Sequence, residues 1–486
     1  MNGDPVGLAI RPSPSPETLE EIRRNFGLDP AQRLLKTTQS LCPTCLRKIP
    51  AAVYEDGERV LMKKSCPEHG LQVALLENDR RFYHVSDLDA TGQVLAPDAI
   101  LPSGRATACC NGGAAPFSAS GCDGVAKQDA NPACVTVVEV TDACNLACPV
   151  CVSDSRGTAF ISEERFEAQV KALLDKRPLD IVQLSGGEPT IHPSFWKFVD
   201  WLSRQPRVKS IQVPTNGLTL ANEEFARKAV PYRGRLAFSL QLDGITDQTH
   251  QAIRGAPLRT AKELALKNLA ALELPFQAVM VLARSVNEEE IAWVLDAAVS
   301  NPLMRSVVFQ PVTYSGRYDL QVDGLERLCV SDIVKLIVRH GRGRFAEHHF
   351  VSVPCSHPMC ATGALYLRKF GRIHNLNQHV DMARIRERIA GRVLQLKQGE
   401  VNQCLTDGAA TWKQRLAAWM LRNLYREEEK LVVFIKPFMD RHSYDQDRVA
   451  SCCHHILDTH GVPVSFCEYN ATVRTRDRWP EYEGRK

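Results

Sequence analysis

The sequence predicts an α/β fold: a partial (β/α)6 TIM barrel, preceded by a small metal-binding ribbon and followed by an α+β extension. Short apolar runs alternate with helical patterns from residue 135 to residue 320, which favours a parallel sheet that curls into a barrel. Paired cysteines precede this region, and further cysteines follow it. A chain of 486 residues is long enough for about three domains.

The predicted boundaries are, in chain order, a leader over residues 1–36, a ribbon over 37–100, a linker over 101–134, the barrel over 135–320 and a C-terminal cluster and substrate region over 321–486. Within the leader a helix is expected over residues 17–25. Within the ribbon a hairpin is expected over residues 52–60.

Two short knuckles in the ribbon offer ligands for one tetrahedral metal ion. Cys42 and Cys45 form the first knuckle, and Cys66 and His69 form the second. This spacing is typical of rubredoxin-like and zinc-ribbon sites, and iron and zinc both accept such ligands. The alternatives are that the cysteines are buried apolar residues, or that His69 lies just outside the ligand shell.

The linker is rich in Gly, Ala and Ser and contains Cys109, Cys110, Cys122 and Cys134. Four cysteines in a segment with little capacity for a core indicate a site for an auxiliary cluster. The alternative is a flexible tether whose thiols are incidental.

Six strands, separated by five helical patterns, are expected in the barrel region. The strands are predicted at residues 135–140, 181–184, 210–213, 236–241, 276–282 and 306–309, and helices at residues 163–176, 193–203, 222–229, 260–272 and 288–298. Active sites of such barrels lie at the carboxyl ends of the strands.

Three cysteines follow the first predicted strand, in the order Cys144, Cys148 and Cys151. Three thiolates at this spacing can bind three irons of a 4Fe-4S cube and leave the fourth iron open. An open iron can hold a small molecule and deliver an electron into it.

Glycine-rich and polar motifs follow or lie on the next strands. They are Gly186, Gly187, Glu188 and Pro189 after the second strand, Thr215 and Asn216 after the third, and Ser239, Gln241 and Asp243 on one face of the fourth. An inward polar row is unusual in a purely structural strand, because each buried polar group needs a partner. A simple Gly-Gly turn stopped by Pro is the alternative for the first motif.

The cysteine loop, the GGEP turn and the TNG turn resemble those of the radical S-adenosylmethionine (SAM) superfamily. The resemblance implies that the cluster binds SAM, with the GGEP turn beside its methionine end and the polar residues of the third and fourth strands near its carboxylate and ribose. Arg254 is either a carboxylate clamp or a solvated charge at a helix end. Val152 departs from the pattern, because an aromatic residue often follows the third cysteine.

Further segments resemble the archaeal tetraether-synthase family, whose members were earlier described as pterin dimethyltransferases. The segments are residues 308–317, 354–360, 434–440, 451–454 and 466–470, and with the ribbon the likeness covers about residues 35 to 470. It implies an auxiliary cluster held by Cys355, Cys360, Cys452, Cys453 and Cys467. The linker departs from the family's CPxDCGxC pattern, so a second auxiliary cluster has weaker support.

The leading hypothesis is a radical SAM enzyme that activates an sp3 C–H bond, for C–C bond formation or modification on a lipid chain. Methylation of a pterin-like or other small molecule is the alternative chemistry. A metal-ribbon electron-transfer protein is the alternative of another class. The expected cofactors are a 4Fe-4S cluster, SAM, one or two auxiliary clusters and a mononuclear iron or zinc ion, with a flavodoxin- or ferredoxin-type reductant as partner.

Composition adds limits on location and partners. A net charge of +4 does not favour nucleic-acid binding. Seventeen cysteines in CxxC-type spacings suit metal thiolates in a reducing cytoplasm. Apolar residues near helical spacing at Trp412, Leu416 and Trp419 predict an amphipathic helix packed on the barrel, with an alkyl-chain tunnel or a peripheral membrane contact as alternatives.

Overall fold

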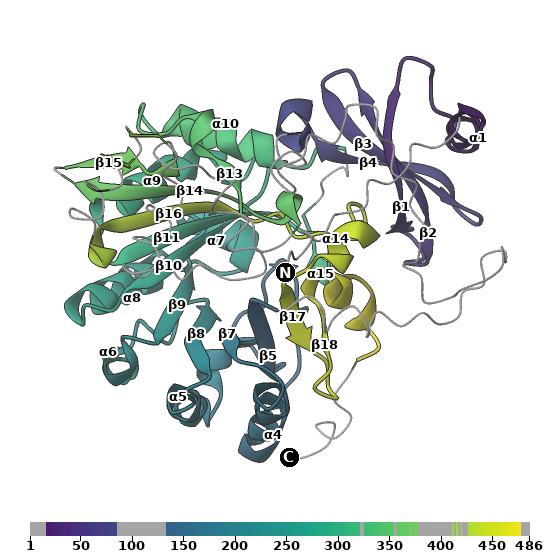
Figure 1. The fold of residues 1–486 in the computed structure, drawn as a ribbon. Coiled ribbons are helices and arrows are strands. Elements are labelled where there is room, and N and C mark those ends of the chain that lie inside the picture. The colour runs from purple at the N-terminus through teal and green to yellow at the C-terminus, as the bar shows by residue number, and fades with distance from the viewer. Residues whose placement is uncertain are drawn as a thin grey trace, which may run out of the picture.

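The structure, a computed structural model, describes residues 16–84, 133–320, 325–353, 357–369, 371–377 and 426–477, with single positions between 411 and 419. Figure 1 shows a small antiparallel sheet near the N-terminus beside a much larger curved sheet whose helices cover its outer face. Among the described residues, no helix combines the length and apolar composition that crossing a membrane requires.

The N-terminal ribbon is an antiparallel sheet with one helix beside it. Its elements are α1 (Pro16–Phe26), β1 (Arg33–Leu41), β2 (Lys48–Asp56), β3 (Arg59–Cys66) and β4 (Gly70–Glu77), and the strands pair in chain order. The predicted hairpin is the β2–β3 turn. Leu19 and Ile22 of α1 pack against Leu34 and Leu61 of the sheet, so an amphipathic helix covers one face of the ribbon.

The predicted partial barrel is confirmed. Its parallel strands, which pair in chain order, are β5 (Val135–Thr141), β7 (Leu179–Gly186), β8 (Val208–Thr215), β9 (Leu236–Gln241), β10 (Phe276–Leu282) and β11 (Met304–Pro311). The helices are α4 (Glu163–Leu174), α5 (Phe195–Ser203), α6 (Glu223–Arg227), α7 (Asp247–Arg254), α8 (Arg259–Ala271), α9 (Ile291–Ser300) and α10 (Val330–His340). Short 3-10 turns lie at Pro189–Ile191, Val230–Tyr232, Glu288–Glu290, Glu347–His349, Pro358–Cys360 and Glu427–Glu429.

The main core lies between the strands and these outer helices. Phe166 of α4 stacks on Phe198 of α5 with ring centroids 4.3 Å apart, and both rings are fully buried. Apolar residues at helical spacing therefore face apolar residues of the strands, as the sequence periodicity requires.

The C-terminal region extends the barrel at both edges, which the sequence did not predict. It contributes β13 (Val351–Ser352), β14 (Thr362–Lys369), β15 (Arg372–Asn375), β16 (Lys430–Ile435), α14 (Gln446–Ala450), β17 (His454–Leu457), β18 (Pro463–Ser465), α15 (Phe466–Glu468) and a π-helical turn at Tyr469–Val473. β16 pairs in parallel with β11, and β17 pairs in parallel with β5. Within the described residues the result is a 12-stranded sheet.

Residues 436–453, which we call the crossing segment, connect these two added strands. Because β16 and β17 lie at opposite edges of the barrel, the crossing segment runs from one edge to the other across the open side. Figure 1 shows this yellow chain between the barrel and the ribbon. The open side of the barrel is therefore covered by residues of the C-terminal region.

The ribbon docks on the crossing segment through buried polar contacts. Lys36 Nζ lies 2.6 Å from a carboxylate oxygen of Asp445, and the Thr38 hydroxyl donates to the same carboxylate at 2.7 Å. The buried ammonium of Lys64 donates to the backbone carbonyl of Arg441 at 2.8 Å. These contacts hold the ribbon against the barrel, since breaking one leaves a buried charge without its partner.

Trp412, Leu416 and Trp419 are 71%, 50% and 61% exposed. Most of the predicted amphipathic helix lies outside the described residues, so its packing on the barrel stays a prediction.

A buried carboxylate at the contact between the ribbon and α10 should make stability depend on pH. Burial raises the pKa of Glu77 to about 7, so ionising it costs more in the folded chain than in the unfolded one. The folded chain should therefore lose stability as pH rises from about 4.5 to about 7, by roughly 3 kcal/mol. Thermal unfolding should show that the stability difference between Glu77→Gln and the wild type grows in favour of the variant from pH 5.5 to 7.5. Above pH 7.5 the difference should stay constant. Parallel pH profiles would contradict this.

Candidate active site

One large cavity occupies the inside of the barrel, with a volume of about 1230 Å³. It reaches from Cys144 and Cys148, beyond the carboxyl end of β5, to Leu236 and Phe276, the first residues of β9 and β10. TIM-barrel interiors are usually filled by side chains. Here the interior is open along the length of the strands, roughly 20 Å at about 3.3 Å per residue.

The structure brings Cys144, Cys148 and Cys151 together on the wall of this cavity. Two hydrogen bonds hold the loop that carries them. Arg317 Nε donates to the Cys148 carbonyl at 2.6 Å, and the Asp319 N–H donates to the Pro149 carbonyl at 2.9 Å. Three thiols on one loop facing a shared space fit the open-iron 4Fe-4S cluster that the spacing predicts.

Two glycines at the end of β7 let the cysteine loop approach closely. A Cβ atom on Gly186 would lie 2.0 Å from the Thr141 carbonyl oxygen, and one on Gly187 would lie 1.9 Å from the Ala143 carbonyl oxygen. The N–H of Gly187 donates to Thr141 at 2.8 Å. The glycines are thus needed for contact with the loop backbone.

The Glu188 side chain joins the ends of β7 and β8. Its buried carboxylate accepts hydrogen bonds from the Thr190 hydroxyl at 2.6 Å, the Thr215 hydroxyl at 2.8 Å and the Asn216 N–H at 2.8 Å. Burial raises its pKa, while these donors favour the charged form. Asn216 also donates to the Asn145 side chain of the cysteine loop at 2.6 Å. Gly186, Gly187, Glu188, Thr215 and Asn216 all line the cavity, and their contact with SAM stays a prediction.

Asp243 and Arg254 form a buried, two-pronged ion pair next to the cysteine loop. Arg254 Nε and Nη2 lie 2.6 and 2.8 Å from the Asp243 carboxylate oxygens. Asp243 is fully buried and also accepts from the Val281 N–H at 2.9 Å. Its carboxylate therefore positions Arg254, and Arg254 is the member that lines the cavity. The solvated-charge alternative for Arg254 is wrong, because that residue is 6% exposed.

Arg254 also acts on the electrostatics of the loop. Burial raises the pKa of the Cys148 thiol, and the adjacent guanidinium of Arg254 lowers it. A thiol must lose its proton to bind iron, so Arg254 favours the state of Cys148 that binds the metal.

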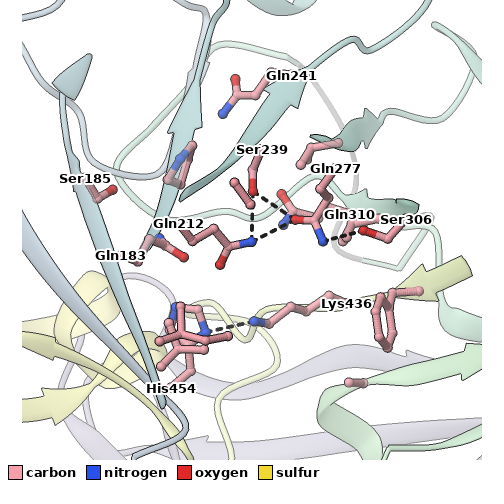
Figure 2. Close-up of a pocket in the computed structure, with 18 of the residues that line it drawn as sticks. Gln183, Ser185, Gln212, Ser239, Gln241, Gln277, Ser306, Gln310, Lys436 and His454 are labelled. Carbon is pink, nitrogen blue, oxygen red and sulfur yellow. Dashed lines mark hydrogen bonds between the residues drawn. The ribbon is translucent and has the colours of Figure 1, made fainter. Parts of the chain in front are cut away.

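Ser239 belongs to a polar row across four strands, which Figure 2 shows inside the cavity. Gln212 donates to Ser239 at 2.8 Å, Ser239 donates to Gln277 at 3.0 Å, and Gln277 donates to Ser306 at 3.0 Å. The sequence analysis missed Gln212, Gln277 and Ser306. Gln212 and Gln277 stand between apolar residues in a strand, as Ser239 does, whereas Ser306 follows Arg305 and carries no such signal.

Gln241 lines the cavity one step nearer the carboxyl end. Its backbone carbonyl accepts from the buried ammonium of Lys262, which also donates to the Asn216 carbonyl. Burial lowers the pKa of Lys262 to about 8. Lys262 thus ties the ends of β8 and β9 together, and nothing in the local sequence distinguishes it from a surface lysine of α8.

The late cysteines gather at the same cavity. Cys360, Cys452, Cys453 and Cys467 line the same cavity as the cysteine loop. The Arg448 guanidinium lies 3.7 Å from Cys360 Sγ, and the Met439 N–H points at Cys467 Sγ from 3.4 Å. Cys355 lies outside the described residues, so the ligand set of an auxiliary cluster stays a prediction.

Of the four cysteines predicted for the linker cluster, the structure describes Cys134. Cys109, Cys110 and Cys122, its proposed partners, lie outside the described residues. The Cys134 N–H donates to the Cys453 carbonyl at 2.7 Å, and both residues line the cavity. Cys134 therefore lies with the C-terminal cysteines at the start of β5.

The ribbon brings its four predicted ligands together. The ligand atoms of Cys42, Cys45, Cys66 and His69 all lie within 4.8 Å of one another. Burial opposes ionisation of Cys42, but the N–H groups of Cys45 and Thr44 lower its pKa to about 6. Four such donors around one point fit a tetrahedral iron or zinc ion.

Two family models match the chain. The HMPTM N-terminal zinc ribbon domain matches residues 34–78, and the Radical SAM superfamily model matches residues 138–298. The first therefore coincides with the ribbon and the second with most of the barrel.

Relatives fall into one full-length and several partial matches. The chain is 24% identical over 494 residues to a 7,8-dihydro-6-hydroxymethylpterin dimethyltransferase of Methanocaldococcus jannaschii, a match that covers 90% of this chain and 94% of that protein. It is 34% identical over 142 residues to the mycofactocin maturase MftC of Mycobacterium ulcerans, covering 29% of this chain and 37% of that protein. It is 27% identical over 184 residues to a GTP 3',8-cyclase of Syntrophomonas wolfei. That match covers 36% of this chain and 55% of that protein.

The close contact of the glycine turn with the cysteine loop predicts that Gly187→Ala loses the cluster. The added methyl group must displace the Ala143 carbonyl and hence the loop. Anaerobically reconstituted Gly187→Ala should contain as little iron and acid-labile sulfide as Cys148→Ala. Gly234→Ala is the matched control, since its Cβ would have nothing within 4 Å. Wild-type iron content in Gly187→Ala would contradict the prediction.

The buried ion pair predicts that Asp243→Asn destabilises the barrel. Removing the carboxylate leaves the Arg254 guanidinium buried without a counter-charge, which should lower the free energy of unfolding by about 3 to 5 kcal/mol. The control is Asp175→Asn, an exposed position at the end of α4, where we expect a change within about 0.5 kcal/mol. Denaturant titration of both variants checks this, and equal stabilities would refute it.

Proposed function

The chain belongs to the radical SAM superfamily, and from this premise we propose that it activates an sp3 C–H bond of an extended, largely apolar substrate, to form or modify a C–C bond on a lipid chain. The observation that carries the proposal is the shape of the cavity. Beyond the space at the cysteine loop that the cluster and SAM would fill, it extends along the barrel to Leu236 and Phe276, the first residues of β9 and β10.

The wall beside the polar row, where β16 pairs with β11, supports an apolar substrate. The C-terminal strands and the segments beside them contribute Val351, Val353, Leu365, Val432 and Phe434 to the lining. Such a surface binds alkyl groups by the hydrophobic effect. It also keeps water away from a reactive radical, which would otherwise be lost to side reactions.

The residues of the chain supply position and protection. SAM bound to a reduced 4Fe-4S cluster supplies a 5'-deoxyadenosyl radical, which is strong enough to remove hydrogen from an unactivated carbon. Cys144, Cys148 and Cys151 would hold that cluster. The Glu188 contacts fix the turns around it, and Arg254 stabilises the thiolate form of Cys148. Electrons would come from a flavodoxin- or ferredoxin-type protein.

Methylation of a pterin-like or other small molecule is the second candidate. The polar row of Gln212, Ser239, Gln277 and Ser306 offers amide and hydroxyl groups of the kind that recognise a heterocycle, and one relative is named as a pterin dimethyltransferase. The four side chains already bond to one another, which reduces their need for a ligand. We therefore rank this function below the first.

Reductive cleavage of SAM is the first test. Anaerobic, reconstituted protein with SAM and dithionite should release 5'-deoxyadenosine, and Cys148→Ala should release none, because the cluster loses one of three ligands. Cys329→Ala is the control: Cys329 is buried in the core that includes Leu34 and Leu61 of the ribbon, and its variant should retain activity. If Cys148→Ala is as active as the wild type, the proposed function is wrong.

Comparing the lipid extract of a deletion strain with that of its parent distinguishes a lipid substrate from a small-molecule substrate. We expect the deletion strain to lack a lipid with a modified or cross-linked chain. An unchanged lipid profile together with a missing methylated small molecule would favour the second candidate.

A further inference from the structure

Lys436 and His454 form a pair that closes the barrel. Lys436 directly follows β16 and is the first residue of the crossing segment. His454 is the first residue of β17 and comes directly after that segment. Lys436 Nζ lies 2.8 Å from His454 Nδ1. In Figure 2 this pair lies across the cavity from the row of Gln212, Ser239 and Gln277. Neither residue has a role in holding the cysteine loop.

The pair presents donors and no acceptor to the cavity. A lysine ammonium has only hydrogens to give, so His454 Nδ1 must accept, and in the neutral ring the hydrogen then stands on Nε2. His454 Nε2 is buried and has no hydrogen-bond partner among the described residues. A buried donor without a partner is costly, so a bound acceptor that reached His454 Nε2 would relieve this cost.

The surroundings make an anionic acceptor the best match. Both residues line the cavity. The hydrogen bond found for the Lys436 ammonium within the described residues goes to His454 and not to a carboxylate. Phe466 lies edge-on to the His454 ring with centroids 4.9 Å apart, and the Lys436 ammonium lies 5.1 Å from the centre of the Phe438 ring. A charge-assisted hydrogen bond is stronger in such apolar surroundings than in water.

We propose that Lys436 and His454 anchor an anionic oxygen group of the substrate, a phosphate or a carboxylate, inside the cavity. This inference rests on the proposed function, since it assigns a polar end to the substrate whose apolar part faces the C-terminal strands. The anion accepts from the remaining Lys436 hydrogens and from His454 Nε2. It thereby fixes how far the substrate enters the barrel.

Binding of simple probes tests the anchor. Octyl phosphate, octanoate and the neutral 1-octanol are titrated calorimetrically into anaerobic, reconstituted full-length protein. The anions should bind about tenfold or more tightly than octanol, the contribution of one charge-assisted hydrogen bond. Lys436→Met should lower anion affinity to that of octanol and leave octanol binding unchanged. Tighter binding of octyl phosphate than octanoate assigns a phosphate, and the reverse assigns a carboxylate.

Two further variants complete the design. Lys209→Met is the matched control: Lys209 lines the same cavity but contacts the Asp180 carboxylate, so its loss should not change anion affinity. His454→Phe keeps an aromatic ring and removes the Nε2–H donor, and it should weaken anions only. If Lys436→Met does not fold or does not retain its iron, His454→Phe replaces it as the variant that tests the anchor.

Equal affinity of the wild type for the anions and octanol would overturn the anchor. So would wild-type anion affinity in both Lys436→Met and His454→Phe, or an equal loss in Lys209→Met. If the protein forms 5'-deoxyadenosine but shows no preference for anions, only the anchor fails. If it prefers anions but forms no 5'-deoxyadenosine, the proposed function fails instead.

Discussion

The close passage of the cysteine loop over the end of β7 is the contact on which the site depends. Gly186 and Gly187 have no side chain, so the carbonyls of Thr141 and Ala143 can occupy the space where a Cβ would stand. Glu188, held next to them, accepts from Thr215 and Asn216 of the neighbouring strand end. The backbone contact and the Glu188 carboxylate together set the positions of the ends of β5, β7 and β8 and of the cysteine loop.

The C-terminal region supplies what the six-stranded barrel lacks. The added strands lengthen the sheet at both edges, and the crossing segment between them brings Cys452 and Cys453 to the cavity. The ribbon then covers the crossing segment through Lys36, Lys64 and their partners. The cavity is therefore enclosed by parts of the chain that lie hundreds of residues apart.

The sequence was sufficient for the parts whose signal is local. The barrel strands each carry a short apolar run, and Cys144, Cys148 and Cys151 carry a spacing that few other sites share. The two added strands could not be placed, because an apolar run predicts a strand but not the edge with which it pairs. Asp243 looked like a ligand residue on the polar face of its strand. Its pairing with Arg254 depends on how α7 packs, which spacing alone does not encode.

The position of β17 also has a consequence for assembly during synthesis. Ribosomes make the ribbon and the six barrel strands first, and until residues 430–457 emerge, β5 and β11 are both unpaired edges with open hydrogen-bonding groups. The interior stays accessible during this interval, so a preformed iron-sulfur cluster can reach the cysteine loop from the open side. β16 then pairs with β11, and β17 pairs with β5. The cavity therefore closes late, because its closure depends on contacts between residues far apart in the chain.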